Sequence, residues 1–200
     1  MKRIMIILAF VFPAFAVMAQ SGHSIDRRFL IKLNPLGTFA AVIPVSTEVF
    51  VSPRFSAGIN GTYQNFTSGS QDNTLDQEGY GVGPEVRFYF VQTEKQDYFS
   101  KVYIGAFYHY EKITNFTKDR FEKEYPGKVD GSSAGLIFGH QFFFKSRFTM
   151  DIYAGPAYSR YFKNENYDQN ITKTNMFMAM ANSRSSGTKV KFGFSLGIRF

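Results

Sequence analysis

The chain of 200 residues contains no cysteine. Without cysteine it cannot form a disulfide framework, a thiolate metal site, a cysteine nucleophile or a lipid-modified N-terminal cysteine. Histidine is also scarce, with three in the whole chain, and none stands at the HxH or HxxxH spacing that would supply a pair of metal ligands. We therefore expect neither a metal ion nor another cofactor.

Long apolar runs are missing as well, except near the N-terminus. There Lys2 and Arg3 precede the apolar residues 4–12, and Ala19 offers a small residue for cleavage. This arrangement is typical of a secretory signal peptide. An uncleaved anchor is the alternative, but a membrane-spanning helix needs about 20 apolar residues, and residues 4–19 are fewer. We predict a cleaved signal peptide at 1–19, a periplasmic lead at 20–28 and one domain at 29–200.

No cluster of like charges stands out, although the formal net charge is +7. Scattered Lys and Arg residues argue against a nucleic-acid site, and an anionic lipid surface explains the charge better. Aromatic residues are abundant instead, with 24 Phe and 12 Tyr. So many phenylalanines exceed the need of a small soluble core, and they suit a wall that faces lipid.

A period-two alternation, typical of β-strands, runs along most of the chain. A helix does not separate residues in this way, because positions two apart lie on opposite sides of it. The pattern is clearest at the C-terminus, where small or cationic residues separate Val190, Phe192, Phe194, Leu196, Ile198 and Phe200. Eight such stretches predict strands at residues 29–33, 41–51, 55–64, 80–90, 101–111, 136–144, 148–159 and 189–200.

The connections between these strands alternate in length. Tight turns occur at residues 52–54 and 145–147, whereas long polar loops are predicted at residues 67–79, 113–131 and 163–187. Short periplasmic turns and long extracellular loops are typical of outer-membrane barrels. We predict an all-β fold, an eight-stranded antiparallel up-and-down transmembrane β-barrel in the outer membrane of a Gram-negative cell, with both barrel termini in the periplasm.

Aromatic residues mark both ends of the predicted lipid-facing surface, as expected for girdles at the two membrane interfaces. The girdle at the long-loop ends consists of Tyr63, Tyr80, Tyr110 and Tyr158. The girdle at the short-turn ends consists of Phe29, Phe55, Phe90, Phe144, Phe148 and Phe200.

The opposite face of the strands carries ionic residues. We predict an ion network in the lumen that includes Lys32, Glu48, Glu85, Arg87, Asp151 and Arg199. A soluble periplasmic lipocalin-like barrel is the alternative, but it would bury these charges in an apolar core at prohibitive cost. Because the interior of an eight-stranded barrel is just wide enough for side chains to fill it, we favour a salt-bridged plug over a narrow channel.

Some residues conflict with simple alternation. Pro44, Pro84 and Pro156 lie inside predicted strands, where proline cannot donate a ladder hydrogen bond, so we expect bulges or strand ends there. His140 falls on the outward face, and a bulge at Gly139 would turn it inward.

Several segments resemble a family of small outer-membrane barrels that is common in Bacteroidota and known only as a domain of unknown function. The segments are Lys32-Leu33-Asn34-Pro35-Leu36-Gly37, Glu48 with Ser52-Pro53-Arg54-Phe55-Ser56-Ala57-Gly58, and Tyr153-Ala154-Gly155-Pro156-Ala157-Tyr158. In topology the chain is also similar to barrels of the OmpA and OmpX type. The resemblance implies a location and a fold but no activity. The last residues, ending in Phe200, resemble the signal read by the barrel-assembly machinery, which we expect as a partner besides outer-membrane lipids and lipopolysaccharide.

Two features of the sequence are candidates for catalysis or metal binding. A lipid A-modifying enzyme would need a histidine within reach of a hydroxyl, but His109 is followed by Tyr110 and Glu111, so we expect a hydrogen-bonding histidine at the barrel rim and no enzyme. Met176, Met178 and Met180 suit cuprous copper in principle, but an apolar loop tip that meets lipid or a partner is the simpler explanation.

Binding through loops is the leading functional prediction, because recognition residues concentrate on loops carried by rigid scaffolds. We expect a structural or adhesive surface barrel that meets an extracellular ligand through residues 67–79, 113–131 and 163–187. A narrow channel and a lipid A-modifying enzyme are the alternatives.

Overall fold

The computed structural model describes residues 29–35, 42–70, 73–94, 98–118, 124–144, 147–164, 166 and 184–200. The predicted signal peptide and the Met176–Met180 segment lie outside these residues. Within the described part of the chain, no helix is long and apolar enough to cross a membrane.

Eight antiparallel strands form one closed sheet. They are β1 (Phe29–Leu33), β2 (Val42–Ser52), β3 (Phe55–Ser70), β4 (Asn73–Glu94), β5 (Tyr98–Lys118), β6 (Glu124–Phe144), β7 (Phe148–Lys163) and β8 (Gly187–Arg199). Each strand pairs with the next along the chain, and β8 pairs with β1 to close the barrel. The predicted up-and-down topology is confirmed.

The orientation of the side chains follows the alternation in the sequence. From Tyr80 to Phe90 on β4, every even-numbered residue is exposed and every odd-numbered residue is buried. Phe192 and Val190 on β8 are 75% and 72% exposed, whereas Asp151 is completely buried. Apolar side chains therefore point outward and ionic side chains point inward. A soluble lipocalin-like barrel has the opposite arrangement, so this alternative is wrong.

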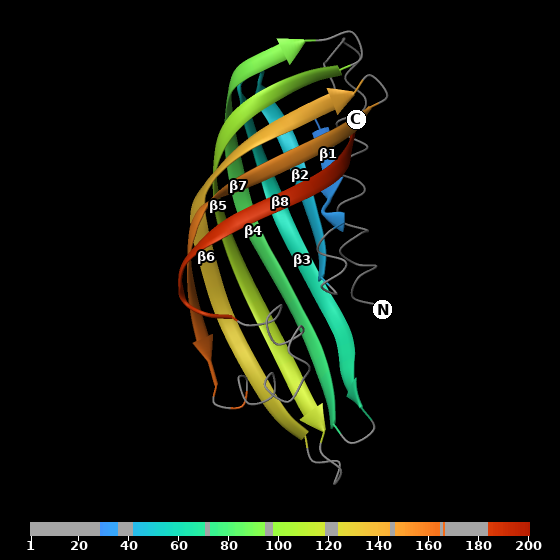
Figure 1. Cartoon of the computed structure of the whole chain (residues 1–200), viewed down its shortest axis with the longest axis vertical. Coiled ribbons are helices and arrows are strands. Elements are labelled where there is room, and N and C mark those ends of the chain that lie inside the picture. The colour runs from blue at the N-terminus through green and yellow to red at the C-terminus, as the bar shows by residue number, and fades with distance from the viewer. Residues whose placement is uncertain are drawn as a thin grey trace.

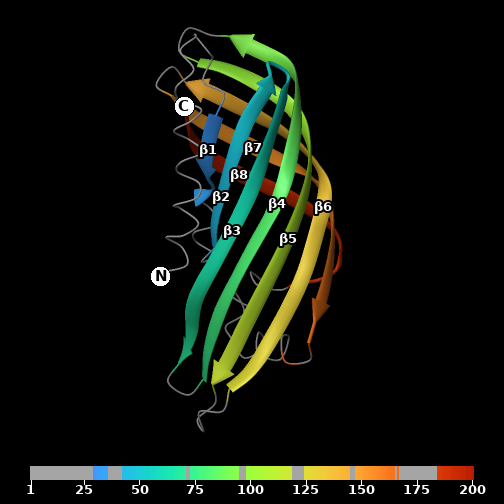
Figure 2. The ribbon, with the colours of Figure 1, turned by 180° about the vertical axis from the view of Figure 1, so that it is seen from behind.

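The barrel wall is uneven in height. β1 has 5 residues and β4 has 22. Figures 1 and 2 show that β3, β4, β5 and β6 continue well past the other strands, at the end of the barrel away from the C-terminus.

Two of the predicted long loops are largely strand. β3 and β4 stay paired as far as Ser70 and Asn73, and β5 and β6 as far as Lys118 and Glu124. The predictions of loops at residues 67–79 and 113–131 are therefore wrong. Their outward positions carry mostly polar residues, so the pattern of apolar outward residues that marks the lipid-facing strands stops before them. The third predicted loop, 163–187, lies mostly outside the described residues.

The outer face of the sheet becomes polar in these extensions. It includes Glu78, Lys112 and Lys128, which are all exposed. The inner face is mixed. Apolar Leu75, Ile113 and Val129 are buried there, together with polar residues such as Gln77 and Asn115. A polar outer face is what a sheet needs in water, so it marks where the wall stops facing lipid.

The aromatic residues predicted as girdles lie on the outer surface near the two ends of the apolar band. At the long-loop side Tyr63 pairs with Tyr80 across β3 and β4, and Tyr80, Tyr110 and Tyr158 are exposed. At the short-turn side the exposed rings are those of Phe55, Phe90, Phe148 and Phe200. Phe29 and Phe144 are half-buried and contact Phe200 and Phe148, with ring centroids 6.3 and 5.8 Å apart.

The prolines are accommodated with little distortion. Pro44 is the third residue of β2, near its end as expected. Pro84 and Pro156 lie inside β4 and β7, where the register is the same before and after each proline, so the expected bulges are absent there. A gap in the ladder on one side of each proline absorbs its missing donor. The register shifts occur elsewhere, between Phe50 and Ser52 and between Tyr89 and Val91.

His140 stays on the outer face. It pairs with Val102 on β5 and Ile152 on β7, both of which are outward residues, and its ring stacks on Phe142 with centroids 4.2 Å apart. The register is unbroken through Gly139, so the expected bulge that would turn His140 inward is wrong.

Candidate functional site in the barrel lumen

A cluster of five ionic side chains occupies the middle of the lumen. Lys32 Nζ lies 2.7 Å from Glu48 Oε2 and 3.1 Å from Asp151 Oδ2. Arg87 Nη1 lies 2.6 Å from Asp151 Oδ2, and its Nε donates to Glu85 Oε1. All five side chains are buried. The structure therefore joins five of the six predicted network residues into one connected set.

Strands far apart in the sequence supply this cluster. Lys32 comes from β1, Glu48 from β2, Glu85 and Arg87 from β4, and Asp151 from β7. Each lies at an inward position of its strand, so closing the barrel brings them together. Gly58 on β3, which pairs with Glu48, has so little space beside the β2 backbone that a Cβ would collide with the Thr47 carbonyl oxygen. A glycine here lets the two strands approach closely.

Polar and aromatic neighbours satisfy the remaining oxygens of the carboxylates. Ser56 Oγ donates to Glu48 Oε1, and the Tyr103 hydroxyl donates to Asp151 Oδ1 at 2.8 Å. The Tyr89 hydroxyl lies within hydrogen-bonding distance of both Glu48 and Gln141. The Arg87 guanidinium also lies 4.2 Å from the centroid of the Tyr103 ring. Buried ions are stable only with such extensive pairing.

Arg199 lies apart from this cluster, at the short-turn end of the lumen. Its guanidinium carbon is 5.2 and 5.6 Å from the ring centroids of Phe99 and Phe143, which stack on each other. Lys101 lies in the same layer and donates to the Pro53 carbonyl oxygen at 2.9 Å. The alternation in the sequence places these residues on the inward face, but it does not specify their layer along the barrel axis.

The packed layers leave little open space across the middle of the lumen. The void beside the ion cluster is about 10 Å³, which is roughly the space that one water molecule needs. A hydrated ion is larger than this void. Side chains therefore fill most of the space beside the ion cluster.

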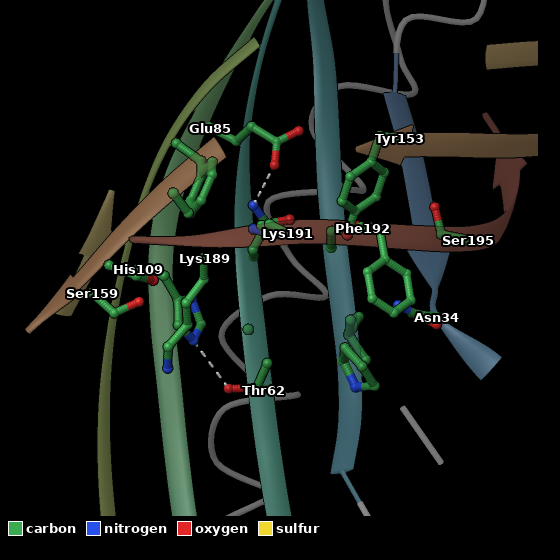
Figure 3. A pocket seen from close by; sticks show the side chains of 18 of the residues that line it. Asn34, Thr62, Glu85, His109, Tyr153, Ser159, Lys189, Lys191, Phe192 and Ser195 are labelled. Carbon is green, nitrogen blue, oxygen red and sulfur yellow. Dashed lines mark hydrogen bonds between the residues drawn. The ribbon is translucent and has the colours of Figure 1, made fainter. Parts of the chain in front are cut away.

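A larger cavity of about 330 Å³ lies next to the cluster, on its long-loop side. Glu85 and Arg87 line it and belong to both features. Figure 3 shows side chains from several strands around this space. The residues that contribute polar or aromatic groups include Thr62, Phe107, His109, Tyr153, Ser159, Lys189 and Lys191.

His109 lies in the wall of this cavity with a hydroxyl beside it. Its Nε2 is 3.3 Å from Thr62 Oγ1 on β3, a contact between strands that the sequence does not reveal. Among the described residues, no hydrogen bond joins a carboxylate to its other ring nitrogen, so the third member of a catalytic triad is not in place. The described residues also contain no group of three or more His, Asp or Glu side chains that could hold a metal ion.

A closed antiparallel barrel with an apolar exterior and a polar lumen, in which Phe29 and Phe200 meet at the short-turn end, defines the outer-membrane class of small β-barrels. The sequence model described as "Protein of unknown function (DUF3575)" matches residues 5–197. The chain belongs to this family, as its sequence motifs indicated. No curated protein matches the chain.

Solved structures with the same fold include the N-terminal β-barrel domain of Pseudomonas aeruginosa OprF, with a TM-score of 0.51 and 12% identity over 88% of this chain and 98% of that one. Neisserial surface protein A is also similar, with a TM-score of 0.47 and 12% identity over 86% of this chain and 97% of that one. At such low identity, the similarity to the OprF domain speaks for the fold alone.

Proposed function

We propose that the protein is a non-conducting outer-membrane barrel that holds two rigid hairpins outside the cell for binding or adhesion. The observation that carries this proposal is the length of the β3–β4 and β5–β6 hairpins. Beyond the Tyr110↔Ser132 pair, β5 and β6 continue for eight residue pairs, to Lys118↔Glu124. At about 3.4 Å per residue, this is roughly 27 Å along the strand.

Two properties of the hairpins support a binding role. Their inner face is packed by Leu75, Ile113 and Val129, which gives them the interior of a folded sheet outside the lipid. Their outer face is polar and presents charges of both signs, such as Lys112 and Asp130, whose side chains are 47% and 48% exposed. A rigid, water-exposed surface on an anchored scaffold is well suited to recognition.

Shortening the hairpins tests this proposal. The shortened variant lacks six residue pairs of each hairpin, namely residues 65–70 with 73–78 and residues 113–118 with 124–129. Because an even number of residues is removed from each strand, every remaining side chain still points to the same side of the sheet. Proteoliposomes carrying the full chain are expected to be retained on surfaces coated with fibronectin, laminin or mucin. The shortened variant should lose this retention while still showing the gel shift of a folded barrel.

A charge-swapped variant, Lys112→Glu with Asp130→Lys, serves as the matched control because it keeps hairpin length and the opposite-charge pair. Reduced retention of this control would assign recognition to charge, and unchanged retention would assign it to shape. Equal retention of the full and shortened chains, or no retention of either on any coating, would refute the proposal.

Conductance in planar bilayers separates a plug from a channel. We expect no steady conductance from the full chain, because ion pairs and aromatic layers fill the middle of the lumen. Stepwise conductance whose ion selectivity changes in Asp151→Asn would instead assign the lumen as an ion path.

Lipid A composition separates a binding protein from an enzyme. Overexpression of the full chain is expected to leave the lipid A of the host cell unchanged in a mass spectrum. A modified lipid A that disappears in a His109→Ala variant would show that the His109–Thr62 pair takes part in catalysis.

A further inference from the structure

The cavity on the long-loop side of the ion cluster has the dimensions of a small-molecule site. Its volume is about 330 Å³, and ligand pockets typically occupy about 300–1,000 Å³ with a few convergent polar groups. Arg87 and Glu85 form its floor, and Phe107 and Tyr153 supply aromatic walls. Figure 3 labels residues around this space that come from β3, β4, β5, β7 and β8, together with Asn34 after β1.

Two lysines of β8 line this cavity. Lys189 and Lys191 are two residues apart on a strand, so their side chains leave the same face. Lys191 Nζ lies 3.6 Å from the ring centroid of Phe107, and Lys189 Nζ lies 5.0 Å from that of Tyr161. Within the described part of the chain, neither ammonium group has a hydrogen-bond acceptor or a carboxylate at ion-pair distance.

This setting differs from that of the other lumen lysines. Lys32 is paired with two carboxylates, and Lys101 donates to a backbone carbonyl. An aromatic ring attracts an ammonium group weakly but leaves its three N–H donors without acceptors. Water in the cavity can accept these hydrogen bonds, and an oxyanion that displaces the water can accept them and balance the charge as well.

Lys191 has an alternative role as a structural counter-ion, which depends on the net charge of the ion cluster below the cavity. The ion cluster has three carboxylates, Glu48, Glu85 and Asp151, and two cations, so Lys191 would be a remote counter-ion for the surplus charge. However, both Glu85 oxygens already accept hydrogen bonds, from Arg87 and from Asn60. Lys189 then adds a second cation with no acidic partner among the described residues at ion-pair distance. With Lys191 counted against that surplus and Glu111 paired with Arg184, the described upper lumen keeps one cation in excess, Lys189.

We propose that this cavity binds the oxyanion of a small organic molecule, a carboxylate or a phosphate, through Lys191 and Lys189. The aromatic walls at Phe107 and Tyr153 take the apolar or planar body of the ligand. The Thr62 and Ser159 hydroxyls supply further hydrogen bonds at the cavity wall. This site is lined mainly by lumen residues, reaches the outward Val190 and Phe192 of β8 at one side, and is separate from the outer faces of the hairpins.

Calorimetric titration of the folded full chain in a non-ionic detergent tests the proposal. The probes are benzoate and phenyl phosphate, with benzamide as an uncharged molecule of similar shape. We expect saturable binding of at least one anion at one site per barrel, weakened by salt, and no binding of benzamide. Preference for phenyl phosphate would identify a phosphate ligand, and preference for benzoate a carboxylate ligand. Absence of binding by both anions, or equal binding of benzamide, would overturn the proposal.

Substitutions locate the site and separate binding from stability. Lys191→Gln is expected to weaken anion binding by about tenfold or more, because one hydrogen-bonded charge pair is lost, whereas Lys191→Arg should retain it. The matched control is Lys112→Gln, which removes the same charge from the outer surface and should leave binding unchanged. If Lys191→Gln instead lowers the unfolding midpoint and leaves anion affinity intact, Lys191 is a structural counter-ion and the proposal is wrong. Binding should also persist in the shortened hairpin variant, so that the two proposals fail independently.

Discussion

Asp151 shows at the scale of a single residue how the lumen is held together. It is completely buried, and it accepts hydrogen bonds from Lys32, Arg87 and Tyr103. A carboxylate in that position is stable only while its cationic partners remain, and each partner depends on the carboxylate in turn. The cluster therefore behaves as a unit.

Asp151→Asn tests this dependence, since asparagine keeps the shape and removes the charge. Leaving Lys32 and Arg87 with fewer counter-charges should lower the free energy of unfolding by about 3–5 kcal/mol. Urea unfolding in lipid vesicles, followed by the gel shift, measures the change. Asp130→Asn is the control, because its partner Lys112 is 4.0 Å away and both side chains are about half exposed. There the change should stay within about 1 kcal/mol, and an equal loss in both variants would contradict the dependence.

Glycines beside inward tyrosines give a second prediction at this scale. A Cβ added at Gly193 would collide with the ring of Tyr153, and one at Gly139 with the ring of Tyr103. Gly193→Ala should therefore cost about 1–3 kcal/mol of stability through overpacking, measured by the same urea titration. Gly61→Ala faces outward, with its nearest neighbour, the Val45 carbonyl oxygen, at 3.7 Å, and should have little effect. No loss in Gly193→Ala would mean that the ring moves aside freely.

Among the strands, β1 and β8 have the most demanding role, because they close the barrel with the shortest ladder. Only four residue pairs join them, from Leu30↔Arg199 to Leu33↔Leu196. Phe29 and Phe200 extend this contact, since the Phe200 amide donates to the Phe29 carbonyl oxygen at 2.8 Å and the rings are 6.3 Å apart. An unclosed edge in lipid would leave backbone groups without partners.

Phe200→Ala is expected to lower the fraction of chains that reach the folded, heat-modifiable form in cells. Its ring contributes to the closing contact, and the resemblance to a C-terminal assembly signal points in the same direction. Phe148→Ala serves as the control, because Phe148 lies at the same end of the wall and is 39% exposed but is not at the chain end. Equal folded fractions for the two variants would argue against a special role of Phe200.

At the scale of the whole molecule, polarity divides the barrel into zones. A band with apolar residues outside lies between the phenylalanine and tyrosine positions, and beyond Tyr80 and Tyr110 the outer face is polar and apolar residues are among those buried inside. The barrel thus combines a wall suited to hydrocarbon with a sheet suited to water. This division is the basis for placing it in a membrane with its hairpins outside.

Val86→Lys tests the lipid-facing assignment. Val86 is 44% exposed on the outer face of β4, between Phe90 and Tyr80. A lysine near the bilayer midplane costs about 2–4 kcal/mol, so the variant should fold less completely in vesicles. Asn65→Lys, at an exposed outward position beyond Tyr63, should fold normally. If both variants folded equally well, the apolar band would not be in contact with lipid.

Much of this architecture can be predicted from the sequence because a lipid-facing wall imposes strict alternation. From Tyr80 to Phe90 on β4 and from Val190 to Ile198 on β8 each outward residue is apolar, so strand existence, facing and number follow from the pattern. The same signal fails in the hairpin extensions, where Leu75, Ile113 and Val129 keep the inward parity but the outward face becomes polar. Alternation is still present there. Strands would have been revealed by the apolar residues at inward positions together with the polar residues at outward positions.

By itself, the sequence determined the fold class, the inward direction of the ionic residues and the family, because local alternation and short motifs encode them. Only the tertiary structure decided which of these residues meet. Register and barrel closure join Lys32, Glu48 and Asp151 in one cluster, leave Arg199 in another layer and bring Thr62 beside His109. Such contacts depend on strand stagger around the whole ring, which no local stretch of sequence specifies.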